Sequence, residues 1–194
     1  MVGDTQSEPA YTKSGGATCD DRAVEFVVRR IEADEWEPFR RLRLEALKDS
    51  PLAFVEQYEE SLAEPEEFWR NRVHLSATDG DRTTVVAVHD GRFIGKASCF
   101  VDPQVTDARA GHLFGVYVTP AARGTGVAES VVEAALRWAY EEAGVDRVRL
   151  FVTEINERAA AFYRRLGFER TGHTMAYPPE PTYLEHEMQR RAPL

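Results

Sequence analysis

The chain has 194 residues, of which 43% are hydrophobic and 29% are charged, and its formal net charge is −9. This length and composition predict a soluble globular protein with a core of its own. The negative charge argues against a nucleic-acid partner, because domains that bind phosphate backbones usually carry a basic face. No apolar run approaches the roughly 20 residues of a membrane-spanning helix, so we expect no membrane partner and a cytoplasmic location.

The first part of the chain differs from the rest in composition. Residues 1–22 are polar and lack hydrophobic periodicity, so we expect a flexible N-terminal arm followed by a single domain over residues 23–194. The two cysteines, Cys19 and Cys99, cannot form a disulfide framework and lack the spacing of metal ligands. No metal is therefore expected.

The N-terminal half of the domain predicts one strand and two helices. The β-branched run 24–28 is suited to a strand. Asp34 and Glu37 have the spacing of a capping pair, which predicts a helix that Pro51 ends. Pro65 is a favoured first-turn residue and predicts the start of a second helix.

A β-hairpin and a further strand are expected next. The apolar runs 84–88 and 93–100 flank Asp90 and Gly91, a pair typical of a type I′ turn. The following strand is expected at 112–118. Up to this point the sheet is predicted to be antiparallel.

The C-terminal half alternates helices and strands. We expect a long helix at about 124–143, a strand at 147–152, a helix at about 157–165, and two last strands near 168–177 and 183–188. Strands that alternate with helices indicate parallel pairing, so the fold class is α/β with a mixed sheet.

A glycine-rich turn between a strand and a helix carries the strongest chemical signal. Gly124 and Gly126 leave room for close approach, and the N–H groups at the start of the helix attract an anion, which together indicate a pyrophosphate ligand. A tight turn without a ligand is the alternative. A Walker loop is excluded because Gly95-Lys96 is followed by alanine, and a dinucleotide fingerprint fits poorly because residue 129 is glutamate.

Two motifs give the chain a resemblance to the GCN5-related N-acetyltransferase (GNAT) family. Arg123, Gly126 and Ala128 match the family pattern of Arg or Gln, two residues, Gly, one residue, then Gly or Ala. The segment 156–168 is similar to the family's Asn-x-x-Ala-x-x-x-Tyr-x-x-x-Gly-Phe segment. The resemblance covers about residues 24–190.

The resemblance implies a GNAT-like mixed β-sheet with an antiparallel N-terminal hairpin, flanked by helices. Its parallel central pair, 112–118 and 147–153, should splay to admit coenzyme A. It also implies acetyl-CoA as co-substrate, with the pantetheine arm on the backbone of the first of these strands. The residues implied in cofactor binding are Val116, Tyr117 and Val118 for pantetheine, Gly124, Thr125, Gly126, Val127, Ala128 and Glu129 for the pyrophosphate, Arg123 near the phosphates, and Asn156.

Two residues are candidates for proton transfer. Tyr163 stands where the family has the tyrosine assigned as general acid, and an O–H donor there would stabilise the departing thiolate. His112 stands where many members carry a glutamate base, and an imidazole with a pKa of about 6.5 could accept the amine proton. A structural tyrosine and a strand-end histidine bonded to backbone are the alternatives. Asn156 could equally be a helix cap.

The function expected from the resemblance is transfer of an acetyl group from acetyl-CoA to a primary amine of a small molecule or of a protein or peptide. The alternative is a non-catalytic acyl-CoA-binding regulatory module with the same fold. The acceptor should contact residues 50–54, 56–69 and 177–185, where Glu56 could attract a cationic amine or simply be a solvated acid. The protein is expected to be a monomer or a homodimer.

Overall fold

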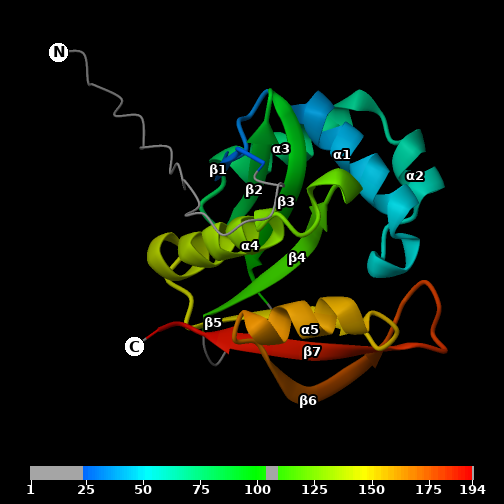
Figure 1. Cartoon of the computed structure of the whole chain (residues 1–194), viewed down its shortest axis with the longest axis vertical. Helices are drawn as coiled ribbons and strands as arrows, with labels where there is room; N and C mark the ends of the chain where they lie inside the picture. The colour runs from blue at the N-terminus through cyan, green and yellow to red at the C-terminus, as the bar shows by residue number, and fades with distance from the viewer. Residues whose placement is uncertain (1–23, 104–108, 194) are drawn as a thin grey trace.

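A seven-stranded mixed sheet organises the protein in a computed structural model, which describes residues 24–103 and 109–193 (Figure 1). The expected arm at 1–22 lies outside these residues. The strand order is β1-β2-β3-β4-β5-β7-β6, with β1 Val27–Arg30, β2 Arg82–His89, β3 Arg92–Val101, β4 Ala110–Val118, β5 Arg147–Thr153, β6 Glu169–Ala176 and β7 Leu184–Arg191.

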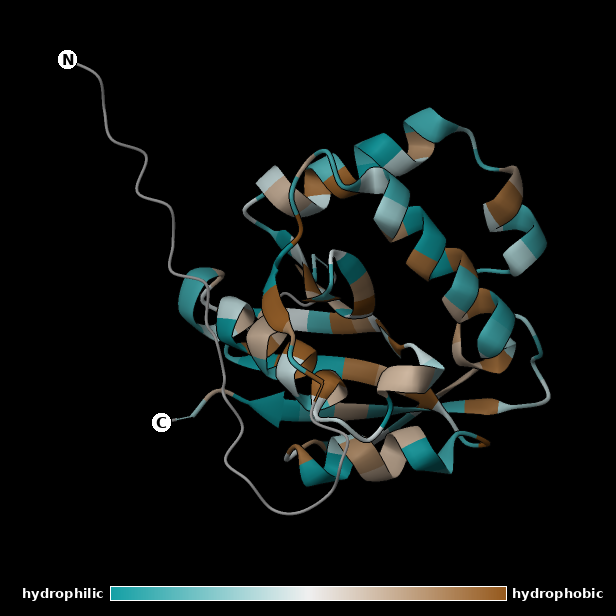
Figure 2. Cartoon of the chain, turned by 45° about the horizontal axis from the view of Figure 1, so that its top comes forward, coloured by the Kyte–Doolittle hydropathy of each residue, from teal (hydrophilic) through white to brown (hydrophobic). Residues whose placement is uncertain are grey.

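Helices cover both faces of this sheet and present their apolar residues to it (Figure 2). Helices α1 and α3 pack on one face, where Phe39, Trp69 and Val86 form a buried core. Helices α4 and α5 pack on the other face, in the larger core. The helices are α1 Trp36–Asp49, α2 Tyr58–Ala63, α3 Glu66–Thr78, α4 Val127–Arg137 and α5 Glu157–Arg165, with short turns η1 Pro51–Ala53, η2 Pro120–Ala122 and η3 Trp138–Glu142.

Local sequence signals account for most of these elements. The turn between β2 and β3 has positive φ at both Asp90 (47°) and Gly91 (71°), which is the type I′ geometry expected from that pair. The predicted α/β mixed sheet is confirmed, and its first four strands are antiparallel as expected.

Two predicted helix starts were wrong. The Asp34–Glu37 capping pair does not form: α1 begins at Trp36, and its cap residue Glu35 makes no side-chain cap bond. Glu35 instead binds the Arg29 guanidinium, with Nη1–Oε2 at 2.8 Å, and the same oxygen accepts from the Glu32 N–H at 2.9 Å. The helix expected from about 124 begins at Val127, because Gly124 and Gly126 both adopt positive φ.

The central strands splay as expected. Strands β4 and β5 pair in parallel only at their starts, from Ala110 with Arg147 to His112 with Arg149, and then diverge. A bulge reinforces the divergence, because Gly115 (φ +62°) and Val116 together lie opposite one residue of β3. The separation leaves a gap in the middle of the sheet.

A buried lysine holds this bulge in place. The Lys96 side chain is 1% exposed, and its Nζ donates to the Gly115 carbonyl at 2.7 Å. Burial, together with the positive charges of Arg43 and Arg72, lowers the pKa of Lys96 well below its usual range. The Lys96 Nζ thus stabilises the backbone of the bulge beside the gap.

Close packing of α4 on β3 depends on a glycine. A Cβ on Gly95 would lie 2.6 Å from Val127 Cγ1, and Val127 is fully buried at the start of α4. We expect Gly95→Ala to destabilise the protein by about 1–3 kcal/mol through overpacking, measured by urea denaturation. Gly80→Ala is the control, since a Cβ there meets nothing within 4 Å. Equal unfolding free energies for the two variants would contradict this account of the helix contact.

Candidate active site

A cavity of about 700 Å³ occupies the region where β4 and β5 diverge. Four of the predicted site residues line it: His112 and Val116 from β4, Asn156 at the start of α5, and Tyr163 from α5. They come together because the crossover α4 makes β4 and β5 neighbours, and because α5 follows β5 directly. The cavity therefore unites the candidate acid, the candidate base and part of the expected pantetheine strand.

The two candidate catalytic side chains approach the gap from opposite faces of the sheet. His112 pairs in register with Phe100, and their rings stack with centroids 5.1 Å apart. The neighbouring residue Leu113 belongs to the core under α4, so strand alternation places His112 on the other face. Tyr163 packs against the α4-side core. A reaction centre between β4 and β5 would thus have one candidate on each side.

Tyr163 is held by aromatic packing rather than by polar contacts. Its ring meets Phe168 edge-on at 5.7 Å and lies 5.2 Å from the Phe162 ring. Within the described residues its hydroxyl has no protein hydrogen-bond partner, and desolvation alone raises the pKa of this phenol. The hydroxyl is therefore protonated at neutral pH and able to donate to a ligand in the cavity.

His112 has a more perturbed environment than its sequence suggested. Burial, followed by the positive charge of Arg149, lowers the pKa of His112 to about 4, and the negative charge of Asp102 opposes this only in part. Nδ1 of His112 lies 3.9 Å from Asp102 Oδ2, but that carboxylate is bound by Arg149, whose Nε donates at 3.2 Å. The expectation of an ordinary pKa was wrong, and the imidazole is neutral at physiological pH.

The glycine-rich turn at the start of α4 is the candidate anion cradle. Gly124 (φ +83°) and Gly126 (φ +86°) turn the chain, and Thr125 Oγ1 closes the turn by donating to the Ala122 carbonyl at 2.6 Å. The first bond of the helix runs from the Ser130 N–H to the Gly126 carbonyl at 3.0 Å, so the preceding N–H groups point out of the helix end. A Cβ built on either glycine would meet no atom within 4 Å, so the space in front of the helix end is open.

The cradle does not line the cavity, and β4 connects the two. Beyond His112 this strand has no parallel partner among the described residues, so one edge of its backbone is free for an extended ligand. The side chains of Tyr117 and Val118 are buried in the two opposite cores. Only the backbone at these positions can therefore contact a pantetheine arm.

Arg123 and Asn156 already have protein partners. Arg123 donates through Nε to the Val118 carbonyl at 3.2 Å and through Nη2 to Asp49 of α1, which fixes the cradle against the first helix. Asn156 Oδ1 accepts from the Ala159 N–H at 3.1 Å, the helix-cap role noted above. Asn156 also lines the cavity.

The three predicted acceptor segments meet at the other end of the cavity. The Tyr177 hydroxyl donates to the Phe54 carbonyl at 2.7 Å and so ties the last hairpin to the segment after α1. Glu56 lines the cavity but is bound by two arginines, and the charge of Arg43 helps to lower the pKa of Glu56 to about 2 despite burial. It is therefore not a free anion for a cationic amine.

Sequence reasoning did not single out four charged residues of the cavity, which are Arg43, Asp102, Arg149 and Glu185, although Glu185 lies within the predicted acceptor segment 177–185. Glu185 of β7 lines the cavity, and desolvation raises the pKa of this carboxyl. Arg43 of α1 lines it as well and is 4% exposed. Alternation along β7 could have identified Glu185. Glu185 and Glu187 lie on one face of the strand and are both acidic, whereas Met188 lies on the other face and is fully buried.

Two findings bear on other kinds of site. Among residues 24–103 and 109–193, no group of three or more His, Cys, Asp or Glu side chains could hold a metal ion. No helix in the same residues has the length and hydrophobicity needed to cross a membrane. The described cysteine, Cys99, is buried in the α4-side core, and burial raises the pKa of its thiol to about 12.

Solved structures share this fold. A GNAT-family acetyltransferase from Streptococcus pneumoniae aligns with a TM-score of 0.73 and 20% identity, covering 87% of this chain and all (100%) of that one. The PaiA N-acetyltransferase from Thermoplasma acidophilum, solved in complex with coenzyme A, aligns with a TM-score of 0.68 and 17% identity, covering 87% and 100%. The chain thus has the fold of these acetyltransferases.

The family follows from sequence. The model described as "Acetyltransferase (GNAT) family" matches residues 29–168. Mycothiol acetyltransferase of Salinispora tropica is 35% identical over 80 residues, which is 41% of this chain and 26% of that protein. An uncharacterised N-acetyltransferase of Mycobacterium tuberculosis is 36% identical over 95 residues, which is 49% of this chain and 58% of that protein. The matches span only part of these relatives. The chain belongs to the GNAT family of acetyltransferases.

Proposed function

We propose that the protein transfers the acetyl group of acetyl-CoA to a primary amine of a small molecule or peptide. The single observation that carries this proposal is the pair of proton-transfer candidates, Tyr163 and His112, on opposite sides of the gap in the sheet. A module that only binds acyl-CoA needs the cradle and the free strand edge, but it does not need a neutral imidazole facing a phenol across a cavity.

The chemistry assigned to these residues follows from where charge develops. The amine nitrogen attacks the thioester carbonyl, the new C–N bond forms, and the C–S bond breaks to release a thiolate. The Tyr163 hydroxyl donates its proton to that sulfur as charge appears on it. The excess proton on nitrogen passes to His112, directly or through water. Acetyl-CoA supplies the activated acyl group, and the cradle and β4 hold its phosphates and pantetheine.

The test is release of free thiol from acetyl-CoA across a panel of primary amines and peptides with a free N-terminus, with each product identified by its mass. The proposal predicts turnover that depends on the acceptor, together with an acetylated amine. Tight binding of acetyl-CoA without acceptor-dependent thiol release would favour the binding module instead.

His112 makes a prediction about pH dependence. Because the pKa of His112 is lowered to about 4, the imidazole is already unprotonated above pH ~5. We therefore expect kcat/KM, corrected for titration of the acceptor amine, to be flat from pH ~5.5 to 8. His112→Ala should lower kcat/KM by about 10²-fold over that range.

Glu185→Gln is the comparison variant, because this carboxyl also lines the cavity and its pKa is raised. A larger loss in Glu185→Gln than in His112→Ala would move the base to Glu185. An ascending limb near pH 6.5 that disappears in His112→Ala would contradict the lowered pKa, and equal rates for wild type and His112→Ala would make the histidine structural.

A further inference from the structure

Arg43 is an arginine buried beside the cavity with part of its guanidinium unused. Its Nε and Nη2 both donate to Glu56 Oε2, at 3.0 and 2.9 Å. Its Nη1 is buried and, within the described residues, has no hydrogen-bond partner. A buried charged donor left without an acceptor is costly, so such a group in a folded protein calls for a partner that the chain itself does not supply.

The surroundings of Arg43 carry excess positive charge. Arg72 Nη2 binds the other oxygen of Glu56 at 2.9 Å, so one carboxylate serves two arginines. The buried Lys96 is near both arginines, since their positive charges help to lower its pKa, and its Nζ and the Arg72 guanidinium lie 5.4 and 5.7 Å from the centroid of the Phe39 ring. No second carboxylate in the described part of the chain forms an ion pair with Arg43 or Arg72, and burial lowers the pKa of Lys96 and so shifts it toward its neutral amine. At least one positive charge is therefore uncompensated.

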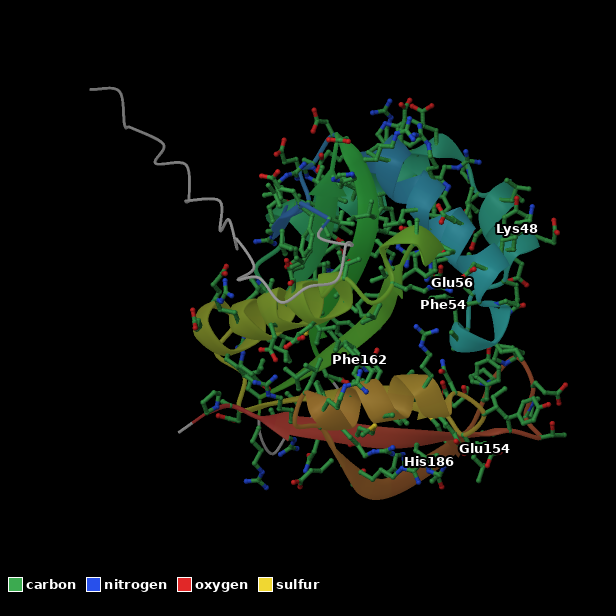
Figure 3. All side chains as sticks on the ribbon, viewed as in Figure 1. Lys48, Phe54, Glu56, Glu154, Phe162 and His186 are labelled. Carbon is green, nitrogen blue, oxygen red and sulfur yellow. The ribbon has the colours of Figure 1, made fainter. Side chains whose placement is uncertain are left out.

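This charge lies at the acceptor end of the cavity, away from the cradle. Arg43 and Phe54 both line the cavity, and the Phe54 ring covers the Arg43 guanidinium with its centroid 4.4 Å away. Figure 3 shows Phe54 and Glu56 next to each other on the segment after α1, on the side that faces α5. Arg43 thus borders this end of the cavity with the Phe54 ring stacked on its guanidinium.

We propose that the acceptor bears a carboxylate in addition to its amine, and that Arg43 binds this carboxylate at the acceptor end of the cavity. The inference rests on the proposed function and names its substrate class. A carboxylate has the planar pair of oxygens that a guanidinium recognises, and its single charge matches two arginines that share one glutamate. Phosphate, with a charge near −2, matches this excess less well.

The experiment compares ω-amino acids of increasing chain length with their carboxamides, which keep the amine and the shape but lose the charge. Free thiol release gives kcat/KM for each pair. At the best chain length, the wild type should prefer the acid by about 10- to 100-fold, the range of a charge-assisted hydrogen bond. Arg43→Met should reduce that preference to near unity. The control is Arg41→Met, an exposed arginine on the same helix, which should keep the preference.

A second variant protects the test against misfolding. If the Arg43→Met protein unfolds because Glu56 keeps only Arg72 as an ion-pair partner, the double variant Arg43→Met/Glu56→Gln removes both charges of the Arg43–Glu56 pair and should lose the preference equally. Acids and carboxamides acetylated at equal rates by the wild type would overturn the carboxylate site while the acetyltransferase proposal stands. A preference for amines that bear phosphate would overturn it too. Absence of acetylation across the whole amine panel would overturn the proposed function itself.

Discussion

Tyr163→Phe is expected to lower kcat by about 10²-fold or more while the affinity for acetyl-CoA stays near that of the wild type. The substitution keeps the ring that packs on Phe168 and Phe162 and removes only the hydroxyl. Because that hydroxyl has no protein partner in the described residues, its loss breaks no structural bond. The effect should therefore fall on protonation of the thiolate, measured as steady-state kcat alongside calorimetric binding of acetyl-CoA.

The matched control is Tyr140→Phe, which removes a hydroxyl that donates to the Arg190 carbonyl at 3.1 Å and does not line the cavity. Its kcat should remain within about twofold of wild type. Its free energy of unfolding should fall by at most roughly 1 kcal/mol, the contribution of a neutral hydrogen bond. The sign of the pKa shift adds a second check. Burial raises the pKa of Tyr163, so the phenol should stay protonated below pH ~9. The pH profile of kcat should therefore show no decrease below pH ~9 that disappears in Tyr163→Phe. A fully active Tyr163→Phe enzyme would assign thiolate protonation to water or another group.

Local patterns predicted the fold well where one short signal decides the geometry. The Asp90-Gly91 turn and the helix start after Pro65 are examples, since each depends on backbone preferences of one or two residues. The α1 start was missed because the cap position is Glu35 rather than Asp34, and the Glu35 carboxylate binds Arg29 and the Glu32 N–H instead of the helix end. The spacing of Asp34 and Glu37 alone does not contain these contacts.

The site divides in a similar way. The glycine turn before α4 and the α5 segment could be predicted because strand, turn and helix are contiguous in the sequence. The low pKa of His112 could not, because it depends on Arg149 of the neighbouring strand and on burial. Arg43 could not be predicted as a site residue either, because the sequence does not show where the guanidinium of an arginine within an apolar helix stripe will lie. These long-range properties decide which acceptor fits, and they come only from packing.

Gly126→Asp is expected to weaken binding of acetyl-CoA by about 10²-fold or more. The new carboxylate would stand at the helix end that receives the pyrophosphate, and like charges a few ångströms apart repel by several kcal/mol at the dielectric of a protein surface. The backbone adds to the effect, since Gly126 has a φ of +86°, which side chains other than glycine rarely adopt. Isothermal titration calorimetry with acetyl-CoA gives the dissociation constant directly.

Gly126→Asn separates charge from shape, because asparagine matches aspartate in size and tolerates positive φ about as well. Binding by the Asn variant should lie between wild type and Asp, and the gap between the two variants should shrink as salt rises, which identifies electrostatic repulsion. Acetyl-pantetheine lacks the pyrophosphate, so wild type and Gly126→Asp should bind it equally through the free edge of β4. Gly144→Asp, at another exposed glycine with positive φ (64°), controls for strain alone. Unchanged acetyl-CoA affinity in a folded Gly126→Asp protein would refute the cradle.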